Sequence, residues 1–152
     1  MKTVYIAPVI FFCLLAGRNA SSSCTPDLCK TPIAEGDNQC GIAGVYQNQL
    51  ESVISFTCKD GSIDGRYCSA VGEAIFFYQL AGRYLVANDN VILGWTVSWV
   101  NAHGNSEATT SWTGISYSGQ DTIDTQWLLV TNKEEFWNTT TINGDTFTKV
   151  CI

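Results

Sequence analysis

Charged residues and histidines are scarce in this chain of 152 residues. Asp, Glu, Lys and Arg make up 14% of the sequence, while aromatic residues reach 12%. A typical soluble domain has about 25% charged residues, and the mixture found here indicates a folded, β-rich domain and argues against disorder. The only histidine, His103, lies in an Asn- and Gly-rich stretch, and the sequence has no C-x-x-C pair. We therefore expect no metal site.

The sequence also lacks the short motifs of common catalytic sites. It contains no G-x-S-x-G, no H-E-x-x-H and no phosphate-binding loop. Asp64, Glu73, Asp124 and Asp145 are carboxylates of the kind that a glycosidase uses in pairs, but no spacing singles out two of them. We expect a protein that is not an enzyme and that needs no cofactor.

No apolar run in the chain reaches the roughly 20 residues of a membrane-spanning helix. Residues 1–20, MKTVYIAPVIFFCLLAGRNA, have an early lysine, an apolar run and small polar residues, which is the layout of a secretory signal peptide. We expect cleavage between residues 16 and 22. Loss of Lys2 and Arg18 lowers Lys+Arg from 8 to 6 and moves the net charge from −6 to −8. Such an acidic, secreted chain is unsuited to nucleic acid or anionic membrane surfaces.

Six of the seven cysteines follow the predicted signal peptide. An even number of cysteines in a secreted chain is typical of disulfides. Residues 21–39, SSSCTPDLCKTPIAEGDNQ, are polar and contain two prolines, which predicts an N-terminal extension before a folded domain at residues 40–152. The six cysteines are Cys24, Cys29, Cys40, Cys58, Cys68 and Cys151.

Alternation with a period of two residues dominates the folded part. In GWTVSW, for example, Trp95, Val97 and Trp99 share one face. Asp60-Gly61 is a signal for a two-residue hairpin turn. Other polar breaks fall at residues 87–90, 102–105, 119–121 and 132–135. The pattern predicts an all-β fold of about eight strands, as an antiparallel up-and-down β-barrel with room for one small ligand. A β-sandwich fits the same pattern.

Several blocks of sequence stand in one order between Gly41 and Val150: YCSAVGEA, LAGRY, LGWTVSWVN, DTQWLLV and GDTFTKV. Together they resemble the avidin/streptavidin family of biotin-binding proteins, and its streptavidin branch most closely. The resemblance implies an eight-stranded barrel that binds biotin at one end.

The same resemblance implies the polar contacts of the ligand. Asn48, Ser52 and Tyr67 would donate hydrogen bonds to the ureido oxygen of biotin. Three donors that converge on one carbonyl oxygen polarise it. Asp145 and Ser69 would accept from the two ureido N–H groups.

The resemblance further implies apolar walls, a sulfur contact and a lid. Thr110 would approach the thioether sulfur of biotin. The walls would be formed by Trp99, Trp112 and Trp127, with Leu50 and Leu129. The lid between the third and fourth strands would consist of Val71, Gly72, Glu73 and Ala74.

Residues 133–140, KEEFWNTT, place Trp137 directly before an N-glycosylation acceptor pattern at Asn138. The resemblance implies that Trp137 leaves its own barrel and covers biotin in a neighbouring subunit. It therefore predicts an oligomer, a homotetramer built as a dimer of dimers.

Four features depart from the family pattern, one of them Tyr46 in place of a core tryptophan of the first strand. Ala108 stands where the streptavidins have a serine near the ligand carboxylate, and Glu73 stands where they have an uncharged amide. Both changes predict weaker binding than the best of the family. The cysteines also differ, and we expect a Cys40–Cys151 disulfide, because the first and last strands of the implied barrel lie antiparallel at its closure.

The sequence thus favours a secreted protein that sequesters biotin without catalysis. The alternative is an extracellular structural or oligomerisation module with an avidin-type barrel and weak or lost biotin binding. A carrier for a different small ligand is a third hypothesis.

Overall fold

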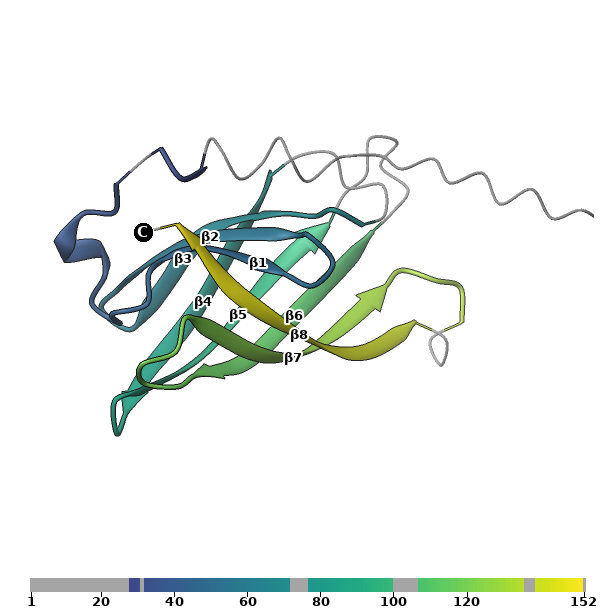
Figure 1. The fold of residues 1–152 in the computed structure, drawn as a ribbon. Coiled ribbons are helices and arrows are strands. Elements are labelled where there is room, and N and C mark those ends of the chain that lie inside the picture. Colours follow the sequence, from purple (N-terminus) through teal and green to yellow (C-terminus); the bar gives the residue numbers. More distant parts are fainter. Residues whose placement is uncertain (1–27, 31, 72–76, 100–106, 136–138, 152) are drawn as a thin grey trace, which may run out of the picture.

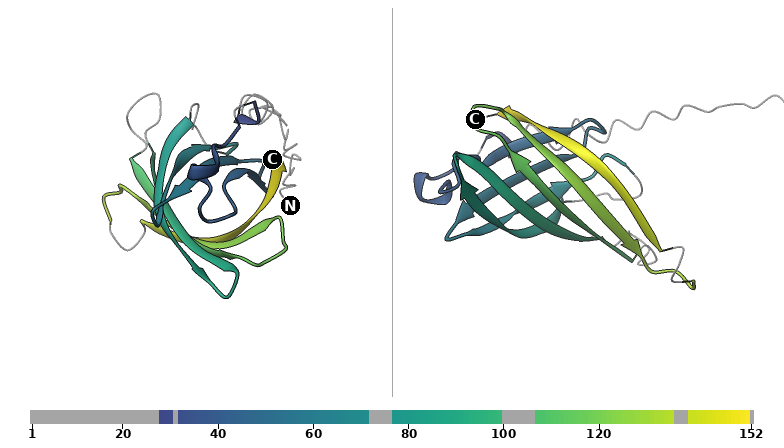
Figure 2. Two further views of the ribbon diagram at one scale, coloured as in Figure 1. Left: turned by 90° about the vertical axis from the view of Figure 1, so that its left-hand side faces the viewer. Right: turned by 90° about the horizontal axis from the view of Figure 1, so that it is seen from below.

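The computed structural model is one sheet of eight antiparallel strands closed into a barrel (Figures 1 and 2). It describes residues 28–30, 32–71, 77–99, 107–135 and 139–151. Each strand pairs with its neighbours in sequence, and β8 pairs with β1 to close the ring. The strands are β1 (Gly44–Asn48), β2 (Val53–Lys59), β3 (Ser62–Cys68), β4 (Phe77–Ala87), β5 (Asn90–Trp99), β6 (Ala108–Ser116), β7 (Thr122–Thr131) and β8 (Thr140–Cys151). This confirms the predicted up-and-down barrel rather than the β-sandwich.

Two-residue turns join the strands where the sequence predicted breaks. Asp60 and Gly61 connect β2 to β3 with φ values of 50° and 75°. Asn88 and Asp89 connect β4 to β5 with φ values of 51° and 65°. Positive φ at both central residues is the requirement of a tight hairpin turn that matches the twist of its strands. The breaks at 119–121 and 132–135 also lie between strands, whereas 102–105 is outside the described residues.

The inner face of the barrel is built from large apolar side chains. Trp95 and Val97 are part of one buried cluster and Trp99 packs against it, as the alternation predicted. Phe147 of β8 is fully buried in the same cluster. Burial of one such side chain contributes about 1.5–3 kcal/mol relative to exposure, so this cluster is a main source of the stability of the barrel.

One end of the barrel is closed by the chain that precedes β1. A short 3-10 helix, η2 (Glu35–Asp37), lies beyond this end, near the C-terminus (Figure 1, left side). Ile33, Cys40 and Ala43 belong to the inner cluster or pack against it. At the opposite end, β1, β3, β5 and β7 end and β2, β4, β6 and β8 begin. No described helix is long and apolar enough to cross a bilayer.

The predicted Cys40–Cys151 disulfide is wrong. Cys40 is bonded to Cys58, and Cys151 is bonded to Cys29. The two expected partners lie on opposite faces of the barrel wall. Cys40 and Cys58 belong to the inner cluster. Cys151 pairs with Val45 across a β-bulge and packs with it in a separate cluster on the outer face.

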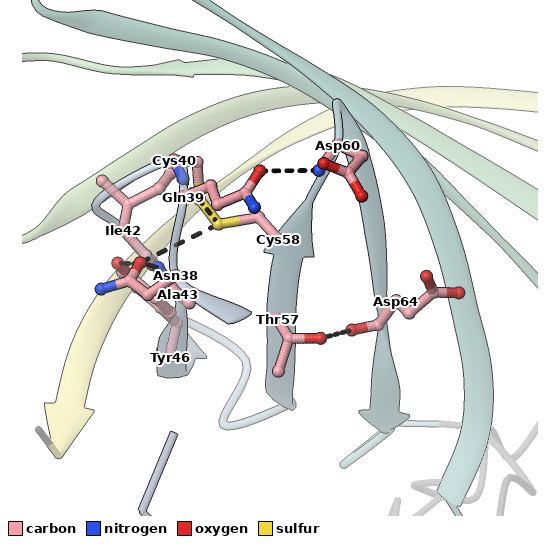
Figure 3. The surroundings of a disulfide bond; sticks show 10 residues. All are labelled: Asn38, Gln39, Cys40, Ile42, Ala43, Tyr46, Thr57, Cys58, Asp60 and Asp64. Carbon is pink, nitrogen blue, oxygen red and sulfur yellow. Dashed lines mark hydrogen bonds between the residues drawn. A yellow bond between two sulfur atoms is a disulfide. The ribbon is translucent and has the colours of Figure 1, made fainter. Parts of the chain in front are cut away.

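Hydrogen bonds fasten the segment before β1 to the β2–β3 hairpin around the inner disulfide (Figure 3). Asn38 forms an isolated parallel bridge with Cys58, and its side-chain Oδ1 accepts a hydrogen bond from the Ala43 N–H at 2.8 Å. Gln39 Oε1 accepts from the Asp60 N–H at 2.8 Å. The segment therefore follows the end of β2 and brings Cys40 to Cys58 before β1 begins.

The first described residues of the N-terminal extension lie against the outer wall. Leu28 and Cys29 pack against a cluster formed by Val45, Val53 and Cys68. Cys68 therefore points outward, whereas its neighbour Tyr67 belongs to the inner cluster. Cys68 is itself disulfide-bonded. The predicted signal peptide and its cleavage point also lie outside the described residues.

Candidate functional site

Three polar side chains gather where β1, its turn and β3 meet. Asn48 ends β1, Ser52 closes the β1–β2 turn and Tyr67 lies near the end of β3. All three are buried. Asn48 Oδ1 accepts hydrogen bonds from the backbone N–H groups of Leu50, at 3.1 Å, and Ser52, at 2.9 Å. Because the amide oxygen is used within the turn, the Asn48 NH₂ group remains as a donor for another partner.

The Tyr67 hydroxyl is held in its protonated form. Burial raises the pKa of Tyr67 well above its usual range, and the neighbouring Asp145 charge raises it further. A hydrogen bond with Ser52 lowers the same pKa, but by less than burial raises it. At physiological pH the Tyr67 phenol therefore carries its proton and acts as a hydrogen-bond donor.

Asp145 brings a buried carboxylate into the same region from β8. Its Oδ2 accepts from Trp112 Nε1 at 3.2 Å, and its Oδ1 accepts from Gln49 Nε2 at 3.0 Å. Its backbone carbonyl accepts from Thr125 Oγ1 at 2.8 Å. These donors are neutral, so they offset the cost of burying the charge less than a cation would. Each carboxylate oxygen also keeps acceptor capacity for a further N–H donor.

Aromatic rings surround these polar groups. The Tyr67 ring stacks on Trp112 with centroids 5.1 Å apart and meets Trp99 edge-on at 5.2 Å. Trp99 Nε1 donates to Thr110 Oγ1 at 2.7 Å, which fixes both side chains. Trp127 lies opposite Trp112 in the β6–β7 register. Its indole N–H is buried and has no hydrogen-bond partner among the described residues.

The start of the β3–β4 connection is also ordered by side chains. Ser52 Oγ accepts from the Ala70 N–H at 3.0 Å. Ser69 Oγ donates to the Val71 carbonyl at 2.8 Å, and Ser69 itself is buried. Val71 is 50% exposed and Leu50 is 48% exposed, so these two predicted site residues lie at the rim.

The structure therefore brings most of the sequence-predicted site residues into one region. Leu129 is half-buried and pairs with Thr110, while Ala108 pairs with Trp99. The residues that meet in the interior are Asn48, Ser52, Tyr67, Trp99, Thr110, Trp112, Trp127 and Asp145. The predicted positions that lie outside the described residues are Gly72, Glu73, Ala74, Trp137 and Asn138.

One residue in contact with the candidate site was missed by the sequence analysis. Gln49 contacts the Asp145 carboxylate from the β1–β2 turn, although the two residues are 96 positions apart. Gln49 stands between Asn48 and Leu50 in the stretch NQLES. No periodicity or motif marks it, because its contact depends on how β1 meets β8.

The chemistry of this region suits a binding site. It combines converging hydrogen-bond donors, one buried carboxylate and aromatic walls, which together suit a small, flat ligand with both acceptor and donor groups. Among the described residues, no group of three or more His, Cys, Asp and Glu side chains is arranged to hold a metal ion.

The comparison with protein families agrees with this geometry. A family model described as the Avidin family matches residues 36–150, which covers all eight strands up to the next-to-last residue of β8. The match spans more than half of the chain. The chain therefore belongs to the avidin family.

Proposed function

We propose that this protein binds and sequesters biotin and catalyses no reaction. The observation that carries the proposal is the convergence of buried donors and a buried carboxylate inside an aromatic enclosure. Asn48, Ser52 and Tyr67 supply donors from one side, and Asp145 supplies an acceptor from the other. Membership of the avidin family supports the same ligand.

The ureido group of biotin matches this distribution of donors and acceptors. Its carbonyl oxygen accepts hydrogen bonds, and its two N–H groups donate them. We infer that the oxygen meets Asn48, Ser52 and Tyr67, while the N–H groups meet Asp145 and Ser69. A neutral group that satisfies buried polar atoms in this way recovers hydrogen bonds that would otherwise stay unmade.

The aromatic side chains suit the remainder of the ligand. Trp99, Trp112 and Trp127 form walls for the bicyclic ring and its aliphatic chain, and Thr110 lies beside Trp99 to meet the sulfur. Burial of the ring between indole faces adds the apolar part of the affinity. The rim position of Val71 fits a segment that closes over the ligand.

We also propose that the protein acts as a secreted homotetramer. The two described disulfides suit an oxidising, extracellular compartment. The outer wall exposes Leu85, Ile92 and Ile142 at 62%, 44% and 68%. Leu85 and Ile92 are paired in the β4–β5 register, and neighbouring exposed apolar side chains support a surface that another subunit covers. The same exposed apolar side chains favour a second candidate function, a structural module that assembles without a ligand.

Calorimetric titration with biotin tests the proposal. We expect one site per chain, and we expect Asp145→Ala to weaken binding at least about tenfold, because a hydrogen bond to a charged group is lost. Asp124→Ala is the matched control, since Asp124 is an exposed carboxylate on β7 that accepts from Thr146 Oγ1. Absence of heat, together with no displacement of a fluorescent biotin analogue, would refute the proposal. An assembled protein with that result would favour the structural module.

A further inference from the structure

The barrel closes through an incomplete pair of strands. The last β1–β8 pair is Asn48 with Phe147, because β1 ends at Asn48. β8 begins at Thr140, so its residues before Phe147 pair with β7 alone in the described part of the chain. β8 extends beyond the β1–β2 turn at this point (Figure 1). Asp145 therefore lies where the wall has no strand on one side.

The side chain of Gln49 occupies this open edge. Its Oε1 accepts a hydrogen bond from the Thr146 N–H at 3.1 Å. Its Nε2 donates to the Gly144 carbonyl at 3.2 Å. A side-chain amide thus takes the place of the peptide group that a longer β1 would have offered to β8.

The same amide reaches the carboxylate of the site. Gln49 Nε2 also donates to Asp145 Oδ1 at 3.0 Å, while Trp112 Nε1 donates to Asp145 Oδ2 at 3.2 Å. Both carboxylate oxygens of Asp145 therefore accept a hydrogen bond. Oδ2 accepts from Trp112 in the barrel interior, and Oδ1 accepts from Gln49 at the seam between β1 and β8. Gln49 is itself exposed and lines a groove on the outer wall together with Gly144 and Thr146.

We propose that Gln49 is a positioning residue for the ligand-binding carboxylate. It closes the seam between β1 and β8, fixes the orientation of Asp145 before the ligand arrives, and separates that carboxylate from water in the outer groove. An acceptor that is already oriented loses less conformational entropy when the ligand binds. Loss of Gln49 therefore accelerates ligand dissociation. The inference rests on the proposed binding of biotin at Asp145.

The test compares dissociation rates of biotin from the whole protein. Gln49→Ala removes the side chain, and Gln49→Met keeps its length but lacks the amide. We expect dissociation about tenfold faster in both variants, the effect of losing one hydrogen bond to a charged acceptor. Gln47→Ala is the control, because Gln47 lies two residues earlier, on β1, and its side chain donates to the Glu51 carbonyl, at 3.4 Å. It should leave dissociation unchanged.

Two further measurements separate positioning from general weakening of the fold. In the Asp145→Ala background, Gln49→Ala should have no further effect on dissociation, because the group that it positions is gone. In the ligand-free protein, the ¹³C resonance of the Asp145 carboxyl carbon should shift in Gln49→Ala and stay in place in Gln47→Ala.

The outcomes are distinct. An unchanged resonance in Gln49→Ala overturns the inference, and so does a shifted resonance with an unchanged dissociation rate. Equal effects of Gln49→Ala with and without Asp145 also overturn it. Failure of the wild-type protein to bind biotin refutes the proposed function instead, and the resonance then decides whether Gln49 orients Asp145.

Discussion

Phe147→Ala should be among the most damaging single substitutions in this protein. Phe147 is 0% exposed, and its ring lies edge-on to Trp95 at 5.7 Å and to Tyr67 at 6.4 Å. Its backbone pairs with both neighbours of β8, at Asn48 and Ile123. A buried Phe→Ala change costs about 3–5 kcal/mol through lost transfer energy and the cavity left behind. We expect a loss of about 4 kcal/mol in the free energy of unfolding.

Urea unfolding of the ligand-free protein measures this loss. With a slope of about 2 kcal/mol per M for a small domain, the midpoint should fall by about 2 M. Thr148→Ala is the control on the same strand, because Thr148 is exposed and such a change stays within about 0.5 kcal/mol. A loss below about 1 kcal/mol for Phe147→Ala, or equal losses in both variants, would refute the reasoning about the core.

Three other predictions concern ionisation, disulfides and assembly. Because burial raises the pKa of Tyr67, a spectrophotometric titration should show a tyrosine that does not ionise near pH 10, and stability should fall as the pH rises above about 10, where only the unfolded chain releases that proton. Mild reduction followed by alkylation should open Cys29–Cys151 before the disulfide of Cys58, which is 0% exposed; the opposite order in peptide maps would contradict this. Trp137→Ala should speed biotin dissociation and weaken the oligomer in native mass spectrometry, and an unchanged assembly would remove its proposed contact with a neighbouring subunit.

The strands were predictable from the sequence because their signal is local. The alternation around Trp95, Val97 and Trp99 gives one buried face, and positive-φ turns such as Asp60-Gly61 fix where strands end. No local signal in the sequence decides between a barrel and a sandwich. The choice depends on whether β1 and β8 pair, and the structure shows that they do.

The disulfides and Gln49 could not be predicted for a related reason. A β-bulge between the pairs of Val45 and Tyr46 places Cys151 on the outer face, and the path of the chain before β1 brings Cys40 to Cys58. Neither feature has a signature in the sequence. The role of Gln49 likewise depends on where β1 stops beside β8. The site residues were expected only through the family resemblance, since an aromatic stripe alone is typical of an ordinary core.

The most direct test of the proposed site is a crystal structure of the protein grown with biotin. The account predicts the ureido oxygen within about 3 Å of the side-chain donors of Asn48, Ser52 and Tyr67, and a ureido N–H on the Asp145 carboxylate. Biotin bound anywhere else, or an empty site at saturating biotin, would contradict it.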